Sequence, residues 1–180
     1  MNRLRATVKN NKGLSLAELI IALALLGMTL ALGYILIVTV TNIFTLAEKR
    51  SNIQQGARMA GDLITQKVRY ANYLEIIDVS TPANFANTSY YYIYQTGNAI
   101  QYRLPGENTG NNISSGIFDD LHFNLLFTKG TNNQILNFSV QASKMDATAY
   151  SISSEVLCLN LTEITGLNSN KAIRFKMPAP

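Results

Sequence analysis

The most distinctive feature of the hydrophobic pattern is a long apolar run close to the N-terminus. Residues 19–47 contain no charged side chain, and the densest part, residues 19–40, is rich in Leu, Ile and Ala. As an α-helix these 22 residues would be roughly 33 Å long, which matches the roughly 30 Å hydrocarbon core of a bilayer. The pattern therefore predicts a membrane-spanning helix.

Beyond this run the pattern becomes that of an amphipathic helix over residues 48–77. Polar side chains separate apolar ones that recur at spacings of three and four, as on one face of a helix. No proline occurs before residue 82 to interrupt the helix. The apolar positions form one stripe that needs a packing partner: Ile53, Ala57, Ala60, Ile64, Val68, Ala71 and Leu74.

The C-terminal half carries shorter runs that are typical of β-strands. Residues 89–95 and 99–104 flank one turn, and residues 121–129 and 135–142 flank another. Each pair predicts a hairpin. Residues 150–161 form a third β-prone run.

Two further segments complete the expected fold. Residues 105–116, rich in Asn and Gly, predict a loop. Residues 167–180 predict a loose tail with a short apolar patch at Ile173 and Phe175. The whole pattern predicts an α+β fold, in which a long N-terminal helix (transmembrane first half, amphipathic second half) packs on a C-terminal antiparallel β-sheet head.

The net charge of +4 has a definite location in the chain. Arg3, Arg5, Lys9 and Lys12 precede the apolar run with no acid among them. Without these four, the basic side chains fall from 15 to 11, equal to the 11 acidic ones. A nucleic-acid partner gains no support from this count, because such proteins gather basic residues on a folded face. The basic residues predict a cytoplasmic N-terminus, with the C-terminal head outside the membrane.

Three classes of N-terminal segment fit the apolar run. One is a signal peptide cleaved near Thr45-Leu46-Ala47, although 22 apolar residues are long for such a segment. The second is an ordinary signal anchor. The third class, to which the next motif points, also accounts for Glu18 at the edge of the run. A carboxylate at membrane depth is energetically costly, and such residues are usually functional.

The residues around Glu18 carry a specific motif. The string Lys12-Gly13-Leu14-Ser15-Leu16-Ala17-Glu18-Leu19-Ile20 follows a basic stretch and opens a long apolar segment. It resembles the class III leader of type IV prepilins and type II secretion pseudopilins. The resemblance implies cleavage by a prepilin peptidase between Gly13 and Leu14, and N-methylation of Leu14. It also implies that Glu18 neutralises the N-terminal amine of a neighbouring subunit in an assembled filament.

The resemblance implies four segments. They are a basic leader (1–13), a transmembrane and filament-core helix (14–47), its amphipathic continuation (48–77) and a β-rich head with a loose tail (78–180). The implied partners are the prepilin peptidase, other pilin or pseudopilin subunits and the membrane. The implied location is the cytoplasmic (inner) membrane, followed by a cell-surface or periplasmic filament.

The kind of subunit is a finer prediction. Major pilins often carry a proline in the membrane half of the helix, and its absence here favours a minor pilin or a pseudopilin. Residues 150–160 and 62–71 are similar to segments of J-type or W-type minor pilins. Pilus, type II secretion and competence systems share the leader and stay open. The alternative is a signal-anchored extracytoplasmic binding domain that forms no filament.

The sequence contains no set of residues typical of an enzyme active site, so we expect a non-enzymatic protein without a cofactor or a metal. His122 is the single histidine and lies in a strand-like alternation. Asp119 and Asp120 beside it suggest calcium only weakly, since two adjacent acids near a turn are usually solvated. Cys158, the single cysteine, is expected to be buried and inert. A tyrosine cluster favours core packing over a binding surface: Tyr90, Tyr91, Tyr92 and Tyr94.

Overall fold

The computed structural model describes residues 15–81, 85–87, 89–113, 120–144 and 148–178. The chain divides into two parts, one ending at Thr45 and one beginning at Leu46, and each is described by itself. The one α-helix of the described residues, α1 (Leu16–Val68), includes residues of both parts. Its continuity follows from the absence of proline, and it confirms the predicted long N-terminal helix.

The helix is shorter at its C-terminal end than predicted. We expected it to continue to residue 77, but it ends at Val68, where the N–H of Ala71 donates to the carbonyl of Val68 in a turn. Ala71 therefore lies in the connection, and Leu74 lies in a strand. The spacing of three continues the helical pattern to Leu74, but Leu74 and Ile76 are also two residues apart, as in a half-buried strand. Pairing with the distant C-terminus selects the strand.

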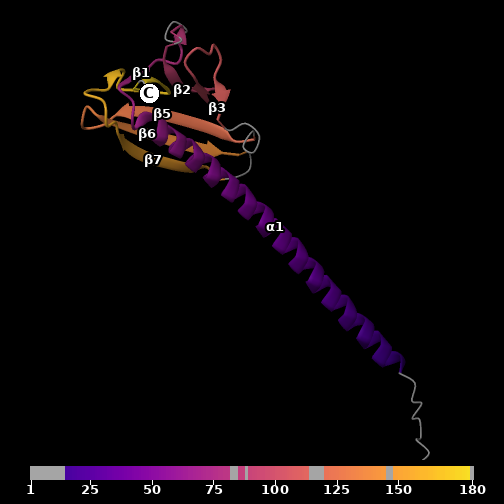
Figure 1. Ribbon diagram of the computed structural model, residues 1–180. Coiled ribbons are helices and arrows are strands. Elements are labelled where there is room, and N and C mark those ends of the chain that lie inside the picture. Colours follow the sequence, from indigo (N-terminus) through magenta and orange to yellow (C-terminus); the bar gives the residue numbers. More distant parts are fainter. Residues whose placement is uncertain (1–14, 82–84, 88, 114–119, 145–147, 179–180) are drawn as a thin grey trace, which may run out of the picture. The chain divides into compact units, whose positions relative to one another are not determined.

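Within the described residues, the head contains ten strands in two sheets, and Figure 1 labels several of these strands. One sheet has the order β4-β3-β2-β10-β1-β8 and the other has the order β7-β6-β5-β9. All pairings are antiparallel except that of β1 with β8. The strands are β1 (Tyr73–Ile77), β2 (Tyr91–Thr96), β3 (Ala99–Arg103), β4 (Asn111–Asn112), β5 (His122–Lys129), β6 (Ile135–Ser143), β7 (Tyr150–Leu157), β8 (Thr165–Gly166), β9 (Ser169–Asn170) and β10 (Ala172–Lys176).

Both predicted hairpins are present. The first joins β2 to β3 through a turn at Gly97, whose φ of 58° lies in the left-handed region that favours glycine. The second joins β5 to β6. The strands alternate between buried and exposed residues as predicted; in β5, Phe123, Leu125 and Phe127 are buried.

The core lies between one face of α1 and the inner faces of the sheets. The buried side chains of the helix begin at Ile53, and Gly61 lies against the ring of Phe138 in β6. Full burial of a side chain such as Ile64 contributes about 2 kcal/mol relative to exposure. The buried helix residues reproduce the predicted stripe up to the end of the helix: Ile53, Ala57, Ala60, Ile64 and Val68.

The C-terminal segment corrects the prediction of a loose tail. Within residues 167–178, β9 and β10 are ordered parts of the two sheets, and β10 lies between β1 and β2. Ile173 and Phe175 are fully buried. Their alternation is a strand signal of only five residues, and the partner strands are about 80 to 100 residues earlier in the chain. Local pattern alone could not identify that pairing.

A buried arginine stabilises the outer face of the larger sheet. Arg103 is 4% exposed, and its guanidinium carbon lies 3.9 Å from the ring centroid of Tyr92. Its Nη2 donates to the carbonyl of Phe85 at 2.8 Å, which ties the loop before β2 to β3. An ion pair also joins β10 to β1, where Nη2 of Arg174 lies 2.7 Å from a carboxylate oxygen of Glu75.

Candidate assembly site at the helix N-terminus

The start of α1 is closed by a reciprocal capping arrangement between Ser15 and Glu18. The backbone N–H of Ser15 donates to Oε2 of Glu18 at 2.9 Å, and the Ser15 hydroxyl donates to the same oxygen at 3.0 Å. In return, the backbone N–H of Glu18 lies 3.3 Å from Oγ of Ser15. This is a capping box, which satisfies free N–H groups of the first turn. A carboxylate here is also favoured by the helix dipole.

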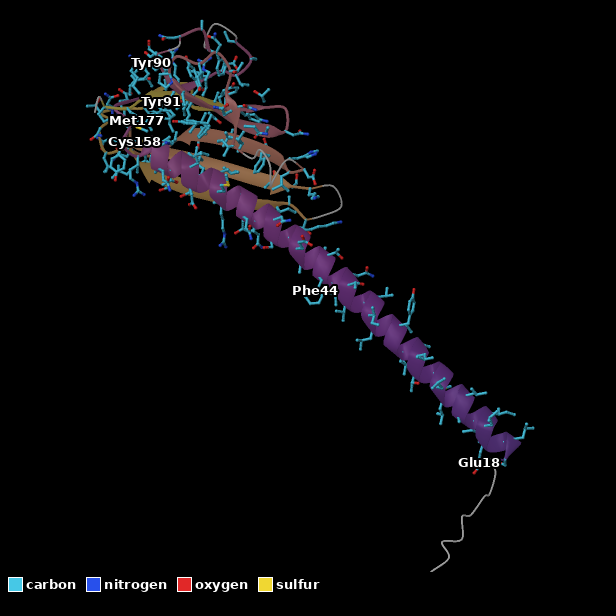
Figure 2. The ribbon with its side chains drawn as sticks, turned by 45° about the vertical axis from the view of Figure 1, so that its right-hand side comes forward. Glu18, Phe44, Tyr90, Tyr91, Cys158 and Met177 are labelled. Carbon is cyan, nitrogen blue, oxygen red and sulfur yellow. The ribbon has the colours of Figure 1, made fainter. Side chains whose placement is uncertain are left out.

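The cap leaves one side of the carboxylate available. Both hydrogen bonds end on Oε2, so Oε1 of Glu18 accepts no hydrogen bond from the described residues. Glu18 is exposed at the helix surface (Figure 2). An ionised carboxylate can accept several bonds. Glu18 can therefore hold the first turn of the helix and still receive a cationic group through Oε1.

The predicted cleavage site itself lies next to this cap. Gly13 and Leu14 lie outside the described residues, so the structure does not test the processing prediction. Ser15 directly follows Leu14 in sequence, and the capping residues therefore all remain in a chain that begins at Leu14. The Ser-x-x-Glu spacing was readable in the sequence, and it is the signal from which this cap could have been predicted.

The helix surface that follows is apolar and unburied. Leu16 is 78% exposed and Phe44 is 70% exposed, and the large hydrophobic side chains between them are exposed as well. Among the described residues, α1 is the one helix long and apolar enough to span a membrane, a test that a signal sequence also passes. An apolar surface of this extent indicates membrane anchoring, because water does not stabilise it.

Four threonine hydroxyls of this segment form hydrogen bonds within the helix. Thr29, Thr39, Thr41 and Thr45 each donate a hydroxyl hydrogen bond to a backbone carbonyl three or four residues earlier. Such bonds satisfy the hydroxyl within the helix. These side chains thereby suit apolar surroundings, where an unpaired donor would be costly.

The other candidate residues belong to the β-rich head. His122 is exposed at the start of β5, and Asp120 forms an ion pair with Lys144 at 3.0 Å. Asp119 lies outside the described residues, within which no group of three or more potential metal-ligating His, Cys, Asp or Glu side chains occurs. Cys158 is fully buried, as predicted, and its burial raises the pKa of the thiol to about 11.

The tyrosine cluster is divided between the two faces of β2. Tyr91 stacks on Phe175 with ring centroids 5.4 Å apart and packs on the main core. Tyr92 is fully buried on the opposite face beneath Arg103. Tyr92 belongs there to a second cluster of buried residues with Ile77 and Ala172, and the half-buried Tyr90 and Tyr94 pack against this cluster. The prediction of core packing is therefore confirmed for Tyr91 and Tyr92.

Comparison with known proteins adds one finding. Residues 8–34 match the family model described as the prokaryotic N-terminal methylation motif. No curated protein and no solved structure matches the chain. The matched segment confirms the resemblance to the type IV pilin and pseudopilin leader, and it supports a substrate of prepilin peptidase. The J-type or W-type assignment stays a prediction.

Proposed function

We propose that this protein is the precursor of a type IV pilin-like filament subunit, either a minor pilin or a pseudopilin. The observation that carries the proposal is the methylation motif at residues 8–34, which runs directly into an exposed apolar helix. That motif is typical of structural subunits, so the proposed role is assembly and not catalysis.

Processing would begin the assembly sequence. Cleavage between Gly13 and Leu14 removes the basic leader and creates a new amine, which methylation of Leu14 would modify. The cut precedes the apolar segment, so residues 14–47 stay on the protein. The same helix then serves first as a membrane anchor and later as part of a filament core. Residues 48–68 continue this helix into the head, which would lie on the extracytoplasmic side.

Glu18 would neutralise the new amine of a neighbouring subunit. A cation buried alone in an apolar filament core costs several kcal/mol, whereas a hydrogen-bonded pair can persist there. Oε1 of Glu18 is the oxygen available for that pairing, because Ser15 already occupies Oε2. Each subunit would then offer its capped carboxylate to one neighbour and its amine to another.

Two matched variants separate the charge of Glu18 from its capping role. Glu18→Gln retains an oxygen that can accept from Ser15 but loses the negative charge. Ser15→Ala keeps the charge but removes the hydroxyl of the cap. Both variants are cleaved by the peptidase in this account, so the measurement is incorporation of processed subunit into sheared filaments by immunoblot. We expect incorporation to fall at least tenfold in Glu18→Gln and less than twofold in Ser15→Ala.

Two results would contradict the proposed role of the Glu18 charge in assembly. If processed Glu18→Gln enters filaments as well as the wild type does, the charge of Glu18 has no role in assembly. If Ser15→Ala is as defective as Glu18→Gln, the contribution of Glu18 is to the helix cap.

A further inference from the structure

The two sheets of the head have four edge strands, and these differ greatly in length. Natural proteins protect sheet edges by making them short, twisted or charged, because an open edge can pair with another chain. Among the described residues, β4, β8 and β9 are edge strands of two residues each. The fourth edge strand, β7, has eight residues. The β7 edge is therefore the long edge of the head and offers the most backbone groups for pairing with another strand.

Backbone geometry identifies which groups of β7 face away from the sheet. The N–H of Cys158 donates to the carbonyl of Gln134, next to the pair of Leu157 with Ile135. Antiparallel strands alternate residues that bond to the partner with residues that do not. The even-numbered residues of β7 therefore bond to β6. The odd-numbered residues direct their N–H and carbonyl groups outward: Ser151, Ser153, Glu155 and Leu157.

The next odd-numbered residue shows that this outer side can pair. The N–H of Leu159, just beyond β7, donates to the carbonyl of Arg69 at the end of the helix, at 2.8 Å. The helix end thus closes the edge after Leu157. Within Ser151–Leu157, no described strand lies on that side, and Figure 1 places β7 at the margin of its sheet.

The strand also has few of the residues that usually prevent pairing. It contains no lysine and no proline, and its one charged side chain is Glu155. Ser151 and Ser153 on the same face are small and exposed. We propose that the open edge of β7 is a docking site for an extended segment of another protein chain, which would add to this four-stranded sheet as a fifth strand beside β7.

The side chains of β7 specify the chemistry of the docking segment. The solvent face of the docking segment would lie beside Ser151, Ser153 and Glu155, so we expect polar residues on that face, with a basic residue opposite Glu155. Its other face would meet Tyr150 and Ile152, which are half-buried, so it carries apolar residues there. Where β7 begins, a hollow of about 210 Å³ can receive one of these side chains; it is lined by Arg50, Ile53, Gln54, Thr148, Ala149 and Tyr150.

This inference concerns the head alone and does not rest on the N-terminal processing proposed above. The probe is a fluorescent ten-residue peptide of alternating Val and Thr, with one Lys placed to face Glu155. Its matched control carries N-methyl groups on the amides that would face β7. Binding to the full chain in detergent is measured by fluorescence anisotropy, and hydrogen exchange of the β7 amides is followed with and without peptide.

Two variants of the protein separate backbone pairing from side-chain contact. Ser153→Ala keeps the outward N–H of residue 153. Ser153→Pro removes that N–H and deletes no hydrogen bond to β6, and an edge strand accepts proline at such an outward-facing position. We expect saturable binding that Ser153→Ala leaves within twofold and Ser153→Pro weakens at least tenfold. The N-methylated peptide should not bind, and the amides of Ser151, Ser153 and Glu155 should become protected.

Three results would overturn the proposal. One is the absence of peptide binding, and another is equal binding of the N-methylated peptide, which is informative even if Ser153→Pro does not fold. The third is a concentration-dependent dimer without peptide that Ser153→Pro abolishes. That dimer would make a second copy of this chain the occupant of the edge, in place of a foreign strand.

Discussion

Substitution of Gly166 by alanine tests whether the C-terminal segment is an integral part of the head. Gly166 lies in β8 opposite Ile76 of β1, with a φ of 83°. A Cβ at this position would overlap the carbonyl oxygen of Ile76 and lie 2.7 Å from Cγ of Glu75. That carbonyl accepts the N–H of Leu167 at 2.9 Å, so the overlap also disturbs a hydrogen bond.

The expected loss is the sum of two effects. A left-handed conformation costs a non-glycine residue about 1–2 kcal/mol, and disturbing the hydrogen bond costs about 0.5–1.5 kcal/mol more. Gly166→Ala should therefore lower the free energy of unfolding by roughly 1.5–3.5 kcal/mol, a substantial share of the 5–15 kcal/mol typical of a domain. Near the midpoint this corresponds to a decrease in Tm of roughly 6–14 °C for a head of this size.

Gly97→Ala is the matched control. Gly97 also has a positive φ, but a Cβ there meets no atom within 4 Å. This variant should therefore lose only the backbone contribution, about 1–2 kcal/mol. Near-ultraviolet circular dichroism is the appropriate assay, because eight of the nine tyrosines follow residue 69 and report the head rather than the apolar helix. If Gly166→Ala unfolds at the same temperature as Gly97→Ala, the close contact of β8 with β1 is wrong.

Three further substitutions test the packing of the head. Gly61→Ala should raise the free energy of unfolding by about 0.5–1 kcal/mol in urea titrations, because alanine favours helix and the new Cβ would meet the Phe138 ring at an ordinary 3.6 Å; a lower midpoint would contradict that spacing. Burial raises the Cys158 pKa to about 11 from 9.0, so its contribution to stability is full below pH 9 and is lost as pH rises toward 11. Cys158→Ala should flatten this decline by about 2–3 kcal/mol, and an unchanged pH profile would contradict burial of the thiol. Arg103→Met should destabilise the head by about 1–3 kcal/mol, since the carbonyl of Phe85 loses its donor; unchanged proteolysis of the loop before β2 would argue against that contact.

The sequence identified the elements whose signals are local. The apolar run, the helix stripe from Ile53 to Val68 and the two hairpins each follow from periodicity and turn residues within a short window. The capping box of Ser15 and Glu18 was also within reach of local pattern. Those predictions required no knowledge of distant partners.

The errors arose where long-range pairing decides the structure. Leu74 continued the helical spacing, and Phe175 belonged to a short patch without a clear turn, yet both lie on the paired strands β1 and β10. The division of the strands into two sheets depends on the same contacts. Arg103 was not a candidate core residue, because its burial depends on the Tyr92 ring and on a loop carbonyl. Such environments exist only after the chain has folded.

The most direct test of the proposed function is mass spectrometry of the N-terminal peptide from cells with and without the prepilin peptidase. The account predicts a chain that begins at Leu14 when the peptidase is present, with the precursor intact when it is absent. A Gly13→Ala variant controls for other proteases and should remain unprocessed in both strains. An intact leader in both strains would contradict the pilin-like function and leave a simple signal anchor, and a chain that starts near Glu48 would reduce the apolar helix to an export signal.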